Sequence, residues 1–166
     1  TAFIHEGSLV VTAVDLHGNQ KWQTAAGPFK SEHGYGSSPV LYGAMVIVLG
    51  DSLDGSFIAA LDRDSGDLIW RKQRRVTGSH GSYATPIVAE IAGKTQLVVT
   101  GTNRVTSYAP ETGDLIWSCT GPSEVSACAV AWYEDLVFAS GGYPEKELLA
   151  IRADGTDDVT DSHVVW

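Results

Sequence analysis

Short runs of alternating apolar and polar residues, separated by turn residues, follow one another along the chain. Apolar positions two residues apart predict β-strands, because successive strand side chains point to opposite faces of a sheet. No segment of about ten residues shows the helical period instead. In the middle of the chain, the pattern predicts strands over residues 38–41, 44–50, 57–62 and 67–72, followed by strands over residues 85–88, 95–101, 105–108 and 114–118.

Glycine-containing turns mark the ends of these predicted strands. Tyr42-Gly43, Asp54-Gly55 and the run Asp-Ser-Gly-Asp at 64–67 separate the first group of strands. Glycine adopts the positive φ of a hairpin turn without steric cost, so each run predicts a tight antiparallel connection. Near the start of the chain, residues 2–4, 9–15 and 19–23 predict three further strands.

The strand pattern is repeated with a nearly constant period. Four of the five tryptophans, Trp22, Trp70, Trp117 and Trp166, are 48, 47 and 49 residues apart. The pair His33-Gly34 returns as His80-Gly81 at a distance of 47 residues. Such periodicity indicates that one supersecondary unit has been copied several times.

A repeated antiparallel unit of four strands and 43–49 residues predicts an all-β fold, a β-propeller of four-stranded blades. We expect about three and two-thirds blades in a single propeller segment covering residues 1–166. A partial blade covers residues 1–27, and three further blades cover residues 28–74, 75–121 and 122–166. Each tryptophan is expected to cover the seam to the next blade. This blade count predicts a fragment of a longer protein or, alternatively, a ring that two chains complete.

The repeat resembles the PQQ-like repeat of quinoprotein alcohol dehydrogenases and of the propeller lipoprotein of the outer-membrane assembly machine. The shared pattern is Ala-x-Asp-x-x-Ser/Thr-Gly-x-x-x-Trp. The second unit matches it fully, and the other units match it in part; the matching positions include Ala60, Asp62, Ser65, Gly66, Trp70, Thr112, Gly113, Trp117, Ala150, Gly155 and Trp166. The resemblance covers the whole chain. It implies rings of seven or eight blades and a periplasmic or extracellular location.

The charge balance excludes one class of partner. The formal net charge is −9, from 20 acidic and 11 basic residues, so phosphate backbones would be repelled and no nucleic-acid partner is expected. The one basic cluster, at residues 71–75, is predicted to be a solvated face at the end of an outer strand.

The longest apolar run, at 44–49, is too short to span a membrane. Cys119 and Cys128 are interpreted as two unrelated thiols.

Two histidines are the candidate ligand-binding residues. His33 and His80 hold equivalent places before the innermost strands of adjacent blades, so they could share a metal or an anionic ligand beside a central channel. The alternative is that each His-Gly pair only shapes an entry turn. The acidic run at 62–67 is similar to the start of a calcium loop, but a hairpin turn is the better interpretation because the twelfth-position glutamate is absent.

The lack of enzyme motifs in the sequence favours a binding module over an enzyme. No nucleophile elbow, zinc-protease motif or phosphate loop is present, and no catalytic or metal-ligating residue is predicted. We therefore expect a non-catalytic scaffold for a protein or peptide partner, without a cofactor. Open terminal blades also make self-association possible. The alternative is a fragment of a PQQ- and calcium-dependent dehydrogenase, although the vicinal cysteines of those enzymes are missing.

Overall fold

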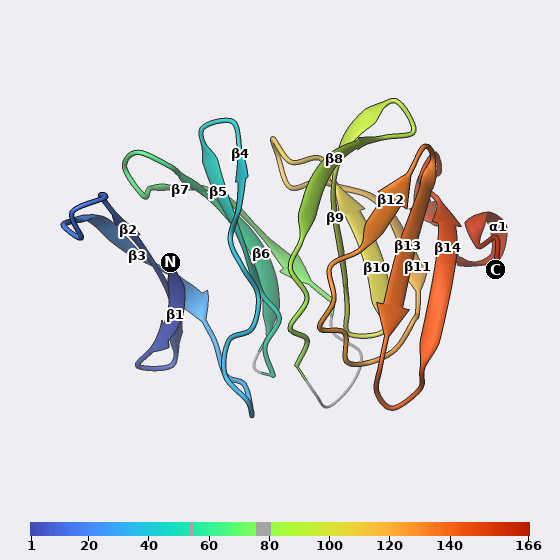
Figure 1. The fold of residues 1–166 in the computed structure, drawn as a ribbon, viewed down its shortest axis with the longest axis horizontal. Helices are drawn as coiled ribbons and strands as arrows, with labels where there is room; N and C mark the ends of the chain where they lie inside the picture. The colour runs from blue at the N-terminus through green and yellow to red at the C-terminus, as the bar shows by residue number, and fades with distance from the viewer. Residues whose placement is uncertain (54, 76–80) are drawn as a thin grey trace.

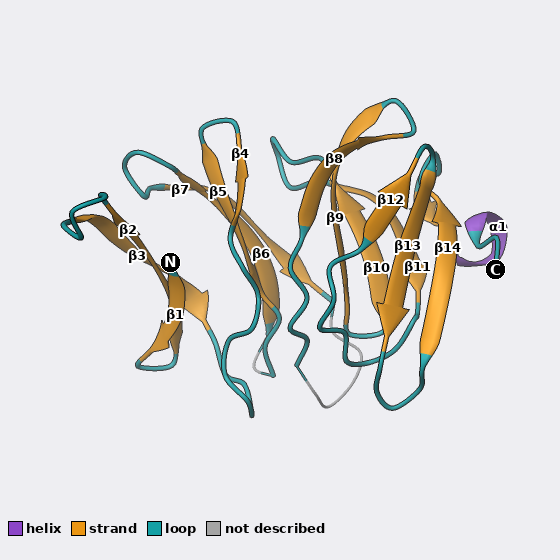
Figure 2. Cartoon of the chain, in the orientation of Figure 1, coloured by secondary structure: helices purple, strands orange, loops and turns teal. Residues whose placement is uncertain are grey.

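The computed structural model describes residues 1–53, 55–75 and 81–166. In these ranges 15 strands form four separate sheets, and a helix of four residues lies near the end of the chain. The sheets stand side by side like a fan from the N-terminus to the C-terminus (Figure 1), and almost no helix accompanies them (Figure 2). The predicted all-β architecture of small antiparallel propeller blades is confirmed.

We call the sheets blades 1 to 4 in chain order. Blade 1 contains β1 (Ala2–His5), β2 (Ser8–Val14) and β3 (Gln20–Pro28). Blade 2 contains β4 (Val40–Tyr42), β5 (Met45–Gly50), β6 (Ser56–Asp62) and β7 (Leu68–Arg74). Blade 3 contains β8 (Ile87–Ile91), β9 (Lys94–Gly101), β10 (Arg104–Tyr108), β11 (Leu115–Thr120) and β15 (Asp157–Asp158). Blade 4 contains β12 (Ala131–Tyr133), β13 (Leu136–Gly141) and β14 (Glu147–Arg152), and α1 covers Thr160–His163. Of the predicted turn Asp54-Gly55, Asp54 lies outside the described residues.

Each pair of neighbouring blades encloses a hydrophobic core. The alternation along β5 shows how one strand supplies two of them: Val46 and Val48 pack toward blade 1, whereas Ile47 and Leu49 pack toward blade 3. A third core lies between blades 3 and 4 and includes Trp117. A sheet buried on both faces needs apolar residues at successive positions, which accounts for the continuous apolar run of β5.

The tryptophans occupy the same cross-strand position in successive blades. Trp22 pairs with Ala13, Trp70 with Ala60 and Trp117 with Ser107, each across the hairpin formed by the last two consecutive strands of its blade. In blade 4, the main-chain N–H of Ala150 donates to the carbonyl of Trp166 at 2.9 Å. Trp166 therefore lies opposite Ala150, in the register that the other tryptophans keep.

The tryptophan of one blade contacts the turn glycine of the next blade. Trp22 Nε1 donates to the Arg63 carbonyl of blade 2 at 2.9 Å, and its ring lies against Gly66, where a Cβ atom would come within 2.6 Å of it. Gly66 also has φ +79°. Only glycine meets both conditions, since other residues would strain the turn and collide with the ring. Trp70 repeats the arrangement in blade 3, donating to the Pro110 carbonyl at 3.1 Å.

The third seam is built differently. Trp117 is fully buried and donates from Nε1 to Gln96 Oε1 of its own blade at 2.7 Å. Gln96 Nε2 in turn donates to the carbonyl of Ala153 in blade 4 at 2.9 Å. Ala153 is the counterpart of Arg63, which accepts directly from Trp22. At the first seam the tryptophan N–H binds the carbonyl of the next blade directly, whereas at the third seam the Gln96 amide bridges the two groups.

The acidic segment at residues 154–161, which follows β14, also contributes to the different structure of the third seam. It turns back toward blade 3, where β15 pairs in parallel with Trp117 and Ser118 of β11. Only then does the chain return to β14 through the bridge between Ile151 and Val164. Among the described residues, the fourth strand of the last blade is therefore represented only by a bridge, and the segment between β14 and that bridge forms β15 and α1.

Candidate functional site

The loops at one end of the fan come together from three blades. Their described parts, residues 29–39, 81–86 and 121–130, precede the first strands of blades 2, 3 and 4 and lie at the lower edge of Figure 1, with the tip of the β13–β14 hairpin beside them. A pocket of about 330 Å³ opens among these loops and is lined by Glu32, His33, Tyr83, Val125 and Tyr143. We call it the loop-end pocket.

Tyr83 is the central residue of the loop-end pocket. Its main-chain N–H donates to the Ser126 carbonyl at 2.9 Å, which fixes the loop before blade 3 against the loop before blade 4. The Tyr83 ring lies against Gly36, where an added Cβ atom would be 3.0 Å from the tyrosine Cβ. The Tyr83 hydroxyl lies 3.4 Å from Ser31 Oγ in the loop before blade 2. One tyrosine therefore contacts the loops of two neighbouring blades.

His33 lies at the rim of this pocket. Its ring centroid is 6.3 Å from that of Tyr83, its side chain is mostly exposed, and its Nε2 lies 4.0 Å from Glu32 Oε2. The second predicted ligand-binding residue, His80, lies outside the described residues. The shared histidine site therefore stays a prediction.

Two residues that sequence reasoning missed complete the pocket. Tyr83 occupies the place that Gly36 has in the preceding repeat, so the departure from the repeat was visible although its meaning was not. Tyr143 reaches the pocket from blade 4, since its main chain pairs with Val125. The pocket thus combines two phenol rings, an imidazole and a carboxylate.

The Asp62 carboxylate is used within its own turn. Its Oδ1 atom accepts hydrogen bonds from the main-chain N–H groups of Ser65 at 2.8 Å and Asp64 at 2.9 Å. These two bonds lower the pKa of Asp62, because they favour the charged form. The run at 62–67 is accordingly a hydrogen-bonded hairpin turn.

The basic cluster at 71–75 is not uniformly solvated. Arg74 is buried between blades 2 and 3, where its Nε donates to Asp51 Oδ1 at 2.8 Å. Its Nη1 donates both to Thr106 Oγ1 at 2.7 Å and to the Tyr108 hydroxyl at 3.2 Å. Burial lowers the pKa of Arg74, but the Asp51 carboxylate and Tyr108 raise it by more, so the net shift is upward. Alternation along β7 turns this one arginine inward while Arg71 and Arg75 stay exposed.

The described residues do not offer a metal centre on their own. Among them, no three His, Cys, Asp or Glu side chains gather closely enough to hold an ion. Cys119 and Cys128 are both free thiols. A calcium-bound quinone needs several carboxylate or amide ligands together, so the residues of the loop-end pocket do not fit that cofactor.

Taken together, the stacked antiparallel sheets and the contacts between tryptophan and glycine at the first two seams define a β-propeller of the PQQ-like repeat type. The model of the family described as outer membrane protein assembly factor BamB matches residues 1–163, and the chain belongs to that family. Within the described residues no helix has the length and apolar character required to cross a membrane.

Solved structures show the same fold. BamB from Moraxella catarrhalis is 19% identical with a TM-score of 0.67, over 99% of this chain and 50% of that protein. A quinohemoprotein alcohol dehydrogenase from Pseudomonas putida HK5 is 17% identical with a TM-score of 0.62, over 100% of this chain and 33% of that protein. The chain thus spans half the length of the first structure and a third of the second. A comparison with curated protein sequences gave no match.

Proposed function

We propose that this chain is a non-catalytic, protein- or peptide-binding part of a propeller that works outside the cytoplasm. The family description, which refers to outer membrane protein assembly, supports both the location and a protein partner. The observation that carries the proposal is the meeting of Glu32, Tyr83 and Tyr143 in one pocket from the loops of three blades. Loops held by a rigid scaffold are a common place for recognition.

The chemistry of the loop-end pocket suits a cationic side chain of the partner. An arginine or lysine placed between the two phenol rings would gain cation–π attraction, and Glu32 would supply an opposite charge at the rim. The net charge of −9 favours the approach of a basic segment in the same way. We therefore expect an arginine- or lysine-containing loop of another protein as the ligand.

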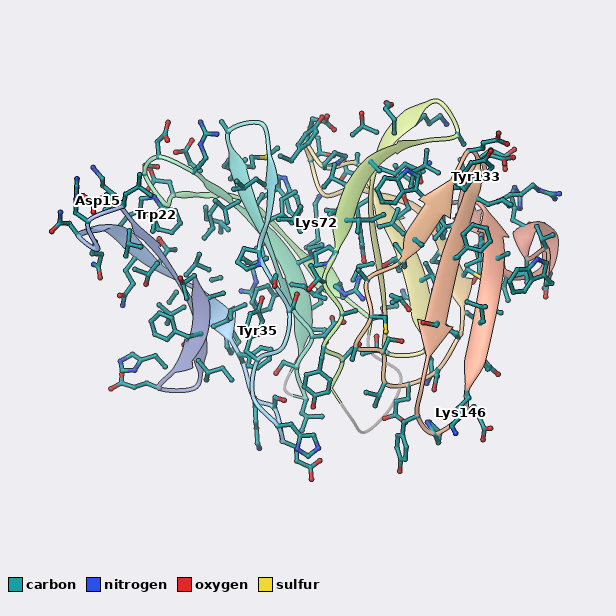
Figure 3. All side chains as sticks on the ribbon, in the orientation of Figure 1. Asp15, Trp22, Tyr35, Lys72, Tyr133 and Lys146 are labelled. Carbon is teal, nitrogen blue, oxygen red and sulfur yellow. The ribbon has the colours of Figure 1, made fainter. Side chains whose placement is uncertain are left out.

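Fluorescence polarisation with labelled arginine-containing peptides tests this proposal. Replacing Tyr83 or Tyr143 by alanine is expected to weaken binding about tenfold, since a partly desolvated cation–π contact contributes about 1–2 kcal/mol. Tyr133→Ala is the matched control, because Tyr133 is 67% exposed and lies away from the pocket. Figure 3 shows Tyr133 at the opposite end of blade 4 from Lys146, which belongs to the same β13–β14 hairpin tip as Tyr143. Equal losses in all three variants, or no binding of any basic peptide, would contradict the proposal.

The alternative function is a part of a PQQ- and calcium-dependent dehydrogenase, and the fold of the Pseudomonas putida enzyme supports it. This alternative requires cofactor ligands beyond the described residues. Incubation with PQQ and calcium distinguishes the two, because a ligand that binds only the native state raises the melting temperature. A saturable increase that needs both components would favour the dehydrogenase over the scaffold.

A further inference from the structure

A second cleft lies between blades 2 and 3 and shares no lining residue with the loop-end pocket. Its volume is about 240 Å³, and residues of β7, β10 and β11 line it, with Lys72, Arg74, Arg75 and Arg104 among them. Lys72 lies between the two blades in Figure 3. Four of the 11 basic residues of an acidic chain thus line one cleft, which we call the basic cleft.

The cations of the basic cleft differ in how far they are already paired. Arg74 forms the floor and is committed to Asp51. Lys72 pairs with Asp114 at 2.8 Å, but both side chains are largely exposed. Arg75 is exposed and has no ion pair with any described residue. Lys72 and Arg75 are therefore available to an incoming carboxylate, because exposed ion pairs exchange partners at little cost.

The outer edge of β7 borders this cleft. Among the described strands, β7 pairs only with β6 and ends its sheet, so half of its main-chain N–H and C=O groups face outward. Such an edge is a template for an added strand. A main-chain template beside a group of cations favours an extended segment that carries acidic side chains.

The same chain shows how this kind of edge is covered one blade further on. There β15, the dipeptide Asp157–Asp158, pairs in parallel with Trp117 and Ser118 of β11. The Val159 N–H donates to the Ser118 carbonyl at 2.9 Å, and an Asp158 oxygen lies 3.8 Å from a terminal nitrogen of Arg104. An acidic strand thus covers the outer edge of blade 3.

We propose that the outer edge of β7 binds an acidic, extended peptide segment of a partner protein as an added parallel strand. By the register of the repeat, Trp70 and Arg71 correspond to Trp117 and Ser118. Adjacent carboxylates of an extended segment point to opposite faces of the sheet. Arg71 lies over the Phe57 ring on one face of β7, and Lys72 lies in the basic cleft on the other, so each carboxylate meets a cation.

This second site is independent of the loop-end pocket and goes beyond the function proposed above. The two sites take ligands of opposite charge, and they have no lining residue in common. Failure of one binding experiment therefore leaves the other proposal unaffected. Tyr83→Ala is expected to leave binding of the acidic peptide unchanged.

The test uses a fluorescein-labelled peptide with the sequence of residues 153–163, the segment that covers β11 in this chain. Its binding to the whole protein is measured by fluorescence polarisation. The double variant Lys72→Gln/Arg75→Gln is expected to bind about tenfold more weakly, since it removes Lys72, which meets one of the two carboxylates, and a second cation of the basic cleft that has no ion pair among the described residues. Arg75→Gln alone should also weaken binding, and it breaks no ion pair within the described residues. Lys21→Gln, on the outer strand of blade 1, is the matched control and should bind as the parent does.

A second peptide separates strand addition from simple charge attraction. It carries an N-methyl group at the position of Val159, which removes the N–H that donates to Ser118 in the intramolecular case. We expect this peptide to lose binding although its charge is unchanged. Equal binding of the methylated peptide would show charge attraction only and overturn the proposal. Binding that ignores Lys72→Gln/Arg75→Gln, or no binding of the unmodified peptide, would overturn it as well.

Discussion

The ion pair between Arg74 and Asp51 gives the sharpest prediction about stability. Their side chains are 2% and 0% exposed, and two hydrogen bonds join them, at 2.8 Å and 3.3 Å. Replacing Asp51 by alanine would leave a guanidinium buried between two blades with only Thr106 and Tyr108 as partners. Stranding a buried charge in this way typically costs about 3–5 kcal/mol, so we expect Asp51→Ala to lower the free energy of unfolding by that amount.

The double variant makes the prediction specific to the pair. In Asp51→Ala/Arg74→Met no charge remains buried, so the loss should be much smaller than the sum of the two single losses. The free energies of unfolding of Asp51→Ala, Arg74→Met and the double variant are measured by guanidinium chloride unfolding. Tryptophan fluorescence reports the transition, since tryptophans lie at each of the three seams. The exposed pair of Lys72 and Asp114 is the matched control, and Asp114→Ala should cost less than about 1 kcal/mol. Additive single losses would refute the reasoning, and so would an Asp51→Ala loss as small as the control.

Four further predictions follow from the seams and turns. In urea unfolding, Gly113→Ala should lower the free energy of unfolding by about 1–3 kcal/mol more than Gly93→Ala does, because both glycines have positive φ but only Gly113 packs against a tryptophan ring. Equal losses of stability would show that the ring contact is unimportant. Gln96→Leu should lower the free energy of unfolding by at least about 2 kcal/mol, since it leaves the buried Trp117 N–H and the carbonyls of Ile91 and Ala153 without their hydrogen bonds. An unchanged free energy of unfolding would contradict the importance of these bonds. The pKa of Asp62 is lower in the folded state than in the unfolded state, so the ionised carboxylate stabilises the fold at a pH above the unfolded-state pKa, and this stabilisation is lost as the pH falls through the folded-state pKa. Asp62→Asn should therefore make the acid loss of stability below about pH 4 shallower. An unchanged dependence of the free energy of unfolding on pH would refute this. Trp166 is 58% exposed on an apolar face of blade 4, so light scattering should show a mass that rises with concentration, and Trp166→Lys should reduce that rise; a constant monomer mass would contradict the prediction.

Much of the fold was predictable because its information is local. The alternation of apolar residues marks strands such as β5, and the turn glycines mark their ends. The period of the tryptophans then implies identical units that must stack, since one small sheet cannot bury both faces alone. The repeat also predicts a turn glycine at Gly66, although the contact of Gly66 with Trp22 of another blade could not be predicted from it.

The candidate sites were much less predictable. His33 was singled out from its register, but Tyr83 and Tyr143 were not, because they reach the loop-end pocket from loops that are far apart in the sequence. The basic cluster at 71–75 was interpreted as one solvated face. The structure divides it, since alternate residues of β7 point to opposite sides and only Arg74 meets a buried carboxylate.

The sequence by itself determined the repeating unit, its strands and its turns, because backbone conformation and the period of a strand depend on neighbouring residues. Only the tertiary structure decided which blade each side chain meets. The return of the acidic segment to β11, the Gln96 link at the third seam and the grouping of cations beside β7 all join residues many positions apart. Contacts of that kind depend on how whole sheets pack, and no local pattern records them.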